Sequence, residues 1–406
     1  MVSILKNNEK LTPYSFYTRF LRDVALNIKA EQDITFKLVE NGDAQIYDSV
    51  YNIEPITIPL LLSLIEQLSK HYKKPINLSL YNNQATKHVL NFLYKSDFFY
   101  VAGNNRNPYH PYGRNILNFK EEYLGDFINK RPRSEHRVRF YSLLENNLQQ
   151  KLDEFTREDD KRDYLISEYS YIVRDHFQDL LFDNANTADK IDIYVEILSE
   201  LITNGVLHSK SNTFALMFVN KFATKFSISD NGIGLVQSLK TKAADTLYKP
   251  QELIQRLQLI KILNVNSKIL ENFDFIIETL YYSCLKDRRG LFDLMLSVVL
   301  NSNGYFRLHC DNSQIIISSR MQKELNDLAN LRNQLFQIHR KILINDVTTE
   351  SQLPYMLELK ASILDHFVLL YENICNKYND DYKYSSIRFF NVKFRGVHIE
   401  VEIPNS

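Results

Sequence analysis

Glycine is scarce in this chain, and its few positions constrain the tight turns and close backbone approaches that the fold can contain. Only 10 of the 406 residues are glycine, roughly 2.5% where about 7% is usual. Glycine adopts left-handed backbone conformations that strain other residues. We therefore expect each glycine to mark a place where backbone geometry matters, and six of the ten lie between residues 205 and 396.

The composition is that of a folded protein without a strong overall charge. There are 49 basic and 49 acidic residues, and 44% of the residues are hydrophobic. This balance disfavours disorder and purely electrostatic binding to nucleic acid. The first ten residues are too charged for a signal peptide, and no run approaches the roughly 18 apolar residues of a membrane span. We expect a cytoplasmic protein of two or three domains that binds neither membranes nor nucleic acid.

Cysteine and histidine give no metal or disulfide signature. The cysteines form no CxxC pair and the histidines form no HExxH or HxH group, so a disulfide framework, a thiolate metal site and a zinc hydrolase are all disfavoured. We expect the three cysteines to be buried as small hydrophobic residues: Cys284, Cys310 and Cys375.

The amino-terminal hundred residues alternate between strand and helix patterns. Period-2 and period-3.6 apolar spacing predicts strands at 34–39, 45–51 and 75–81 and helices at 58–72 and 85–95. This order predicts a small α/β unit. Residues 103–133 are rich in Gly, Asn, Pro and Arg and predict a linker, which the basic cluster from Lys130 to Arg139 extends. Residues 139–182 predict a charged helical connector.

A helix predicted over 191–208 carries the first candidate site. Glu200 and Asn204 are four residues apart and therefore lie on the same face of that helix. An amide oxygen can ligate Mg²⁺, and a carboxylate can orient a nucleophile. The pair is consistent with phosphate chemistry, although polar neighbours of this kind are common on helices.

Two strands and a glycine-rich turn follow this helix. Residues 213–219 and 223–229 predict strands, and the second runs into Asp230-Asn231-Gly232-Ile233-Gly234. Two glycines two residues apart let the backbone approach a planar ligand, and Asp230 is placed to accept a hydrogen bond. A plain tight turn is the alternative reading of this motif alone.

Together these segments resemble the GHKL superfamily of ATPases and kinases. ELITNGVLHS, residues 200–209, is similar to the N-box of that superfamily, and SISDNGIGL, residues 227–235, is similar to its first glycine box. The resemblance implies an α/β sandwich that holds ATP. The resemblance implies that Asp230 binds the adenine amino group, with Gly232 and Gly234 beside it. It also implies that Asn204 coordinates Mg²⁺ and that Glu200 acts as the general base.

Two later segments extend the resemblance. Gly290 precedes a helix predicted over 291–300 and is similar to the second glycine box, where backbone amides meet phosphate, although Phe292 stands where a second glycine is usual. Strands predicted at 305–309 and 314–318, and two more around Gly396 in 387–403, complete the pattern. Val397 replaces a threonine that is common after that last glycine.

The amino-terminal unit resembles STAS-like domains, the fold of anti-sigma-factor antagonists, over about seventy residues. Those antagonists carry a phosphorylated serine at the start of a helix. This chain has Pro55-Ile56-Thr57 there, so Thr57 is the nearby hydroxyl.

The predicted fold is α/β in the broad α+β sense. We expect a STAS-like domain over 1–103, a linker and helical connector over 104–188, and a two-layer GHKL-type sandwich over 189–406. Helical insertions are expected near 242–287 and 320–380.

The predicted function is Mg²⁺-dependent ATP binding, with hydrolysis that signals to a protein partner through the STAS-like domain or the insertions. One alternative is a protein kinase of the histidine-kinase or anti-sigma serine-kinase type, for which His176 is a candidate acceptor. Another is a non-catalytic ATP-binding scaffold, towards which Phe292 and Val397 lean. A homodimer through the helices of 139–182 stays open.

Overall fold

The computed structural model describes residues 1–29, 33–42, 51–127, 135–207, 211–260, 262, 267–378 and 385–405. These residues form a mixed α/β protein with parallel and antiparallel sheets, so the predicted α+β class is confirmed. The chain divides into two compact units. The first unit comprises residues 1–232, 390–400 and 405–406, and the second comprises residues 233–389 and 401–404. The predicted domain boundaries near residues 103 and 188 stay predictions.

The first unit begins with a parallel sheet of strand order β1-β3-β5-β6. Its strands are β1 (Val2–Leu5), β3 (Thr35–Val39), β5 (Ile76–Ser79) and β6 (Leu117–Asn118). A short parallel pair joins β2 (Lys10–Leu11) to β4 (Asn52–Ile53). The helices of this part are α1 (Pro13–Ser15), α2 (Leu21–Lys29), α3 (Ile58–Tyr72), α4 (Lys87–Lys95) and α5 (Phe98–Ala102).

An antiparallel sheet forms the rest of the first unit, with strand order β11-β9-β8-β7. Its strands are β7 (His136–Tyr141), β8 (Thr213–Val219), β9 (Ala223–Asp230) and the part of β11 (Ile387–Pro404) that belongs to this unit. The accompanying helices are α6 (Leu148–Leu152), α7 (Glu158–His176), α8 (Gln178–Leu181) and α9 (Ile191–Leu207). Helix α9 packs on β8 and β9, and α7 packs along α9.

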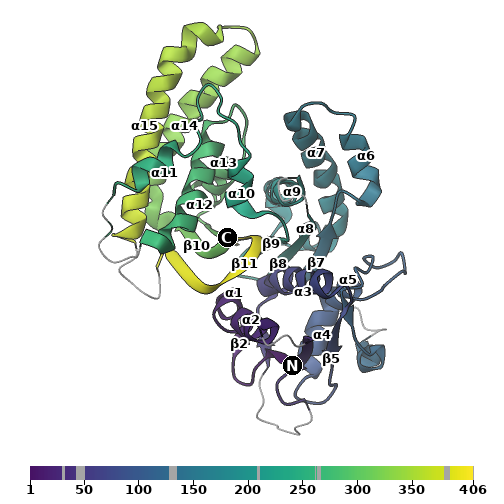
Figure 1. Ribbon diagram of the computed structural model, residues 1–406. Helices are drawn as coiled ribbons and strands as arrows, with labels where there is room; N and C mark the ends of the chain where they lie inside the picture. Colours follow the sequence, from purple (N-terminus) through teal and green to yellow (C-terminus); the bar gives the residue numbers. More distant parts are fainter. Residues whose placement is uncertain are drawn as a thin grey trace. The chain divides into compact units, whose positions relative to one another are not determined.

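Helix α3 explains why the parallel and antiparallel parts share one core. It contacts β5 of the parallel sheet and also β8 and β9 of the antiparallel sheet (Figure 1). A helix that is covered on several sides has to be apolar nearly all round, and ten of its residues are buried, from Ile58 to Leu68. One hydrophobic cluster accordingly runs from Val2 through α3 to Phe140 and Phe214.

Strong local patterns predicted their elements well. Helix α3 and strand β8 have the predicted bounds, and α4, α9, β3, β5 and β9 differ from their predictions by one or two residues at one or both ends. The strand predicted at 45–51 falls almost wholly on residues 43–50, which lie outside the described residues, as do His208 and Ser209 of the predicted N-box.

Strand β7 lies where a basic linker and the start of a helix were predicted. His136, Val138 and Phe140 are buried, which is the alternation of an edge strand, and β7 pairs antiparallel with β8. Arg137 and Arg139 between them donate to carboxylates at 2.8 and 2.6 Å, those of Asp179 and Asp97. The two arginines led to the prediction of a solvated linker. Their acidic partners could not be recognised from the local sequence, because they lie about forty residues away in the chain.

The second unit is largely helical. It contains α10 (Gly234–Lys240), α11 (Glu252–Leu257), α12 (Ser267–Leu285), α13 (Leu291–Leu296), α14 (Gln322–Leu343) and α15 (Thr349–Cys375). Helices α14 and α15 lie side by side as an antiparallel hairpin (Figure 1). Helices α11 and α12 fall within the first predicted insertion and α14 and α15 within the second, whereas residues 241–251 form turns and irregular structure. The two strands predicted between 305 and 318 form a single strand, β10 (Tyr305–Ser318), which is next to β11 in the sheet order.

Residues 387–403 were predicted as two strands, and the structure has one long strand, β11. Gly396 interrupts its regular geometry with a φ of +100°. Within the described ranges of the chain, we find no helix that combines the length and the apolar character needed to cross a membrane.

Candidate functional site

Glu200 and Asn204 lie together on α9, as their spacing predicts. The amide nitrogen of Asn204 donates to Oε1 of Glu200 at 3.4 Å. Glu200 is 9% exposed, and Asn204 is half-buried. Because the contact uses the amide nitrogen, the amide oxygen of Asn204 is not consumed by it and keeps its capacity to ligate a hard cation.

Arg162 on α7 forms an ion pair with the Glu200 carboxylate. Counted without the backbone, the side chains of Arg162 and Glu200 are each 11% exposed. Burial raises the pKa of Glu200, while the charge and hydrogen bond of Arg162 act in the opposite direction. The arginine therefore stabilises the carboxylate as an anion and reduces its tendency to take up a proton. Sequence reasoning missed Arg162, because it lies 38 residues before Glu200 among many other charged residues of a helix.

Asp230 ends β9 as a buried hydrogen-bond acceptor. It is 5% exposed, and its Oδ1 accepts the backbone N–H of Gly232 at 2.8 Å. The backbone N–H of Val397 also donates to the carboxylate. Burial raises the pKa of Asp230 to about 7, against the lowering effect of these two N–H groups. The carboxylate is thus shielded from water and held in place by backbone donors.

Gly396 lets β11 pass directly beside Asp230. A Cβ atom at position 396 would lie 2.0 Å from the carbonyl oxygen of Asp230 and 3.1 Å from its Oδ1. The positive φ of Gly396 disfavours other residues as well. Glycine is therefore required here for two independent reasons, and this close approach brings the N–H of Val397 to the carboxylate.

A buried hydroxyl group, that of Thr213, lies at the same end of β9. Thr213 on β8 is directly opposite Asp230 in the register, so the two side chains lie on the same face of the sheet. A Cβ atom on Gly205 would lie 2.6 Å from Oγ1 of Thr213, so α9 approaches this face closely. The hydroxyls of Thr213 and Thr203 are buried and have no hydrogen-bond partner among the described residues. A buried hydroxyl without a partner costs free energy, and a ligand or a water molecule can supply the missing hydrogen bond.

Gly234 and Gly290 belong to the second unit. Gly234 begins α10 with a φ of +75°, which explains the glycine at this position. Gly290 precedes α13, and its N–H donates to Oδ2 of Asp293 at 3.1 Å, while the N–H of Phe292 donates to Oγ of Ser283 at 3.0 Å. Two amide groups at the start of α13 are thus already used by side chains of the protein.

Arg332 fixes the loop before α13 in this arrangement. It is 1% exposed, and its guanidinium donates to both oxygens of Asp293 at 3.0 Å. It also donates to the carbonyl oxygens of Lys286 and Arg288 at 2.5 and 2.7 Å. Phe292, at the place of the usual second glycine, is fully buried, with its ring centroid 5.5 Å from that of Phe367. The position is part of the hydrophobic core of the second unit.

A second polar cluster ties the glycine-rich turn to α3. Glu66 is 2% exposed and accepts the side-chain amide groups of Asn212 and Asn231. Gln67 Nε2 donates to Oδ1 of Asn231 at 2.9 Å, and Ser63 Oγ donates to the carbonyl of Ser229 at 3.2 Å. Sequence reasoning missed this cluster, although a glutamate inside the apolar run of α3 was a visible signal.

The remaining candidates are accounted for by local contacts. Thr57 is fully buried, and its hydroxyl donates to the carbonyl of Leu11 at 3.3 Å. His176 accepts or donates a hydrogen bond at 3.1 Å with the Tyr141 hydroxyl, and burial lowers its pKa to about 3. All three cysteines are buried, as predicted. In the parts of the chain that the structure describes, no group of three or more His, Cys, Asp and Glu side chains is arranged to hold a metal ion.

The structure therefore brings Glu200, Asn204, Asp230 and Gly232 into one unit, on α9 and at the end of β9. Comparisons with models of protein families, with curated proteins and with solved structures gave no match for this chain.

Proposed function

We propose that this protein binds ATP in the manner of the GHKL superfamily, with Asp230 as the acceptor for the adenine amino group. The observation that carries the proposal is the buried Asp230 carboxylate, held by the N–H groups of Gly232 and Val397. It is flanked by the Thr213 hydroxyl, which has no hydrogen-bond partner within the described part of the chain. A buried acceptor favours a ligand with an N–H donor at this point, because an unmatched acceptor costs free energy. We expect ATP to bind more tightly than GTP, whose base has an acceptor oxygen at the corresponding position.

In this proposal Asn204 ligates the metal ion and Glu200 acts on the attacking water. The amide oxygen of Asn204 is the atom that we assign to Mg²⁺. When bound, Mg²⁺ would neutralise charge on the phosphate groups. Glu200 would orient and deprotonate the attacking water. Burial raises the pKa of Glu200 overall, and the ion pair with Arg162 offsets part of that rise and occupies an oxygen of the carboxylate. We therefore expect slow hydrolysis unless Arg162 moves away.

The proposed role is signalling from the nucleotide to a protein partner in the cytoplasm. The Glu66 cluster supports this proposal, because Asn231 of the glycine-rich turn is hydrogen-bonded to α3, the helix that corresponds to the STAS-like resemblance. A change of backbone conformation at Gly232 would alter these bonds. The STAS-like part and the helical insertions are the surfaces that we propose for the partner, and a homodimer stays open.

A non-catalytic ATP-binding scaffold is the second candidate. The pairing of Arg162 with Glu200 and the burial of Phe292 favour it over fast turnover. A histidine kinase that uses His176 has less support, since this imidazole is largely buried and hydrogen-bonded to Tyr141.

Calorimetry and turnover assays separate these candidates. We expect ATP with Mg²⁺ to bind the wild type and the Glu200→Ala variant with similar affinity, while Glu200→Ala lowers hydrolysis by about 100-fold or more. Asp230→Ala should abolish binding. No binding at millimolar ATP would overturn the proposal, and equal hydrolysis by Glu200→Ala would remove the assigned base. Stable label on the protein from γ-labelled ATP would favour the kinase.

A further inference from the structure

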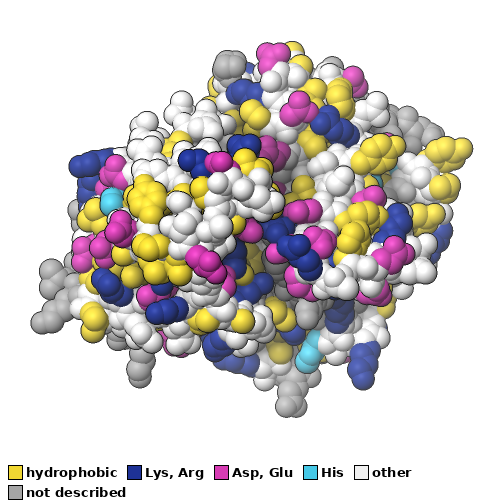
Figure 2. Space-filling model, turned by 90° about the horizontal axis from the view of Figure 1, so that it is seen from above, with side chains coloured by type: hydrophobic (Ala, Val, Ile, Leu, Met, Phe, Trp, Pro, Cys, Tyr) yellow, Lys and Arg dark blue, Asp and Glu magenta, His cyan; other side chains and the backbone are white. Residues whose placement is uncertain are grey.

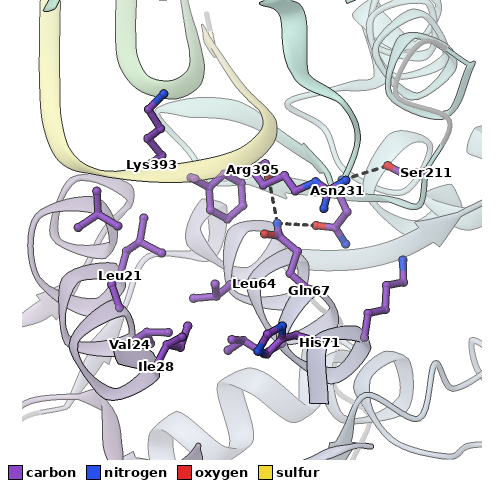
Figure 3. Close-up of a pocket in the computed structure, with 15 residues that line it drawn as sticks. Leu21, Val24, Ile28, Leu64, Gln67, His71, Ser211, Asn231, Lys393 and Arg395 are labelled. Atoms are coloured by element: carbon purple, nitrogen blue, oxygen red, sulfur yellow. Dashed lines mark hydrogen bonds between the residues drawn. The ribbon is translucent and has the colours of Figure 1, made fainter. Parts of the chain in front are cut away.

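The first unit contains a pocket that the proposed nucleotide site does not use. Its volume is about 700 Å³, within the range of about 300–1,000 Å³ that is common for small-molecule sites. Side chains of α2 and α3 form its walls, and residues 392–395 of β11 lie across it (Figure 3). All of its lining residues belong to the first unit.

One part of the pocket is apolar. Leu21, Val24 and Ile28 follow one another at helical spacing along α2 and face Leu64 on α3 (Figure 3). Three of these side chains are otherwise well packed, whereas Ile28 is 36% exposed. An apolar wall with an accessible edge favours a ligand with an apolar chain or ring.

The other part of the pocket carries charge of one sign. Four basic residues line it: Lys70, His71, Lys393 and Arg395. Lys70 also forms an ion pair at 3.4 Å with Glu66 of α3, so a carboxylate outside the lining offsets part of its charge. Among the described residues that line the pocket, none is acidic. Figure 2 shows acidic and basic side chains mixed on the face that it draws. The basic residues of the pocket attract an anion.

Neutral hydrogen-bonding groups also line the pocket. Gln67 Nε2 donates to Oδ1 of Asn231 and to the carbonyl of Arg395, both at 2.9 Å (Figure 3). The backbone N–H of Asn231 donates to Oγ of Ser211 at 3.1 Å. These groups fix the geometry of the pocket next to its basic side chains.

We propose that this pocket binds a small amphipathic anion, a molecule with an apolar chain or ring and one carboxylate or phosphate head. The apolar part lies between α2 and α3, and the head lies at Arg395, whose side chain lies beside Gln67 and Asn231 (Figure 3). Because Asn231 belongs both to the pocket and to the glycine-rich turn, occupancy changes ATP affinity. This last effect rests on the proposed function, and the binding itself does not.

Titration calorimetry without nucleotide tests the binding on the full chain. We expect decanoate or decyl phosphate to bind, and decyltrimethylammonium, with the same chain and the opposite charge, to bind at least about tenfold more weakly. Comparison of the two anions distinguishes a carboxylate from a phosphate head. Equal binding of the cation and both anions, or no binding of either anion at millimolar concentration, would overturn the proposal. So would binding to anionic lipid vesicles without binding to either dissolved anion.

Variants locate the site. The double variant Lys393→Gln/Arg395→Gln changes two exposed residues and should weaken decanoate binding about tenfold or more. Ile28→Glu, also at an accessible position, should weaken it through charge repulsion. Lys120→Gln, which is 76% exposed and does not line the pocket, is the matched control and should bind as the wild type does. Wild-type binding by both pocket variants would overturn the assignment. Because no nucleotide is present, failure here is distinguishable from failure of the ATP proposal.

Discussion

The carboxyl group of Asp230 makes the folding stability of this protein depend on pH, and the variant Asp230→Asn tests how strongly. Burial raises the pKa of Asp230 from 3.8 to about 7. A group whose pKa is higher in the folded state stabilises the fold fully below its unfolded pKa and loses that contribution as pH rises to its folded pKa. At about 1.4 kcal/mol per pH unit between the two values, the contribution is about 4 kcal/mol.

Asparagine has nearly the same shape but does not ionise. Its carbonyl oxygen can still accept one backbone N–H, and the loss of the other hydrogen bond costs about 1 kcal/mol at every pH. The pH-dependent part of the difference is therefore the informative quantity. Relative to the wild type, Asp230→Asn should gain about 3 kcal/mol of unfolding free energy between pH 5 and pH 8.5.

Urea unfolding followed by far-ultraviolet circular dichroism measures this difference, since the chain has no tryptophan to report by fluorescence. The wild type and the variant are compared at each pH, so that other titrating groups cancel. Asp192→Asn, at a side chain that is 91% exposed, controls for the loss of a carboxylate as such. A variant-minus-wild-type difference that stays constant within about 0.5 kcal/mol from pH 5 to 8.5 would refute the buried, proton-binding state of Asp230.

Three further substitutions test other parts of the site by the same unfolding measurement. Arg162→Met removes the ion-pair partner of the buried Glu200 carboxylate and should lower the free energy of unfolding by about 3–5 kcal/mol at pH 7. Adding Glu200→Gln to this variant should restore much of the lost stability. If the two substitutions instead lower stability additively, the ion pair is unimportant. Gly396 has a φ of +100°, and a Cβ atom there would lie 2.0 Å from the carbonyl oxygen of Asp230. Gly396→Ala should therefore lower the free energy of unfolding by at least about 2 kcal/mol. Wild-type stability of this variant would mean that β11 does not pass so close to Asp230. Arg332→Met should lower the free energy of unfolding by about 3 kcal/mol and speed amide hydrogen exchange over 286–290. Unchanged exchange over these residues would contradict the proposal that Arg332 holds this loop in place.

Helices and strands with a regular short-range spacing of apolar residues were predictable from the sequence. Helix α3 and strand β8 have the predicted bounds, and α9 presents Glu200 and Asn204 on one face as their spacing requires. The same holds for the end of β9, where a strand pattern ends in aspartate and glycine. In each case the information lies within a few residues of the chain.

Elements whose identity depends on distant partners were not predictable. Strand β7 carries arginines that pair with Asp97 and Asp179, each 42 residues away in the chain. In the helical region around 291, Phe292 departs from the expected glycine because its side chain fills a core contact with Phe367, which no local pattern indicates.

The sequence by itself determined the α+β class, the main helices and strands, and the types of side chain that end them. The tertiary structure alone decided the electrostatic state of the candidate site, since it placed Arg162 on Glu200 and the backbone of Val397 against Asp230. It also placed Glu66 and Gln67 of α3 on Asn231. The physical reason is that periodicity reports which face of an element is apolar, whereas the energy of a buried charge depends on which distant groups fold against it.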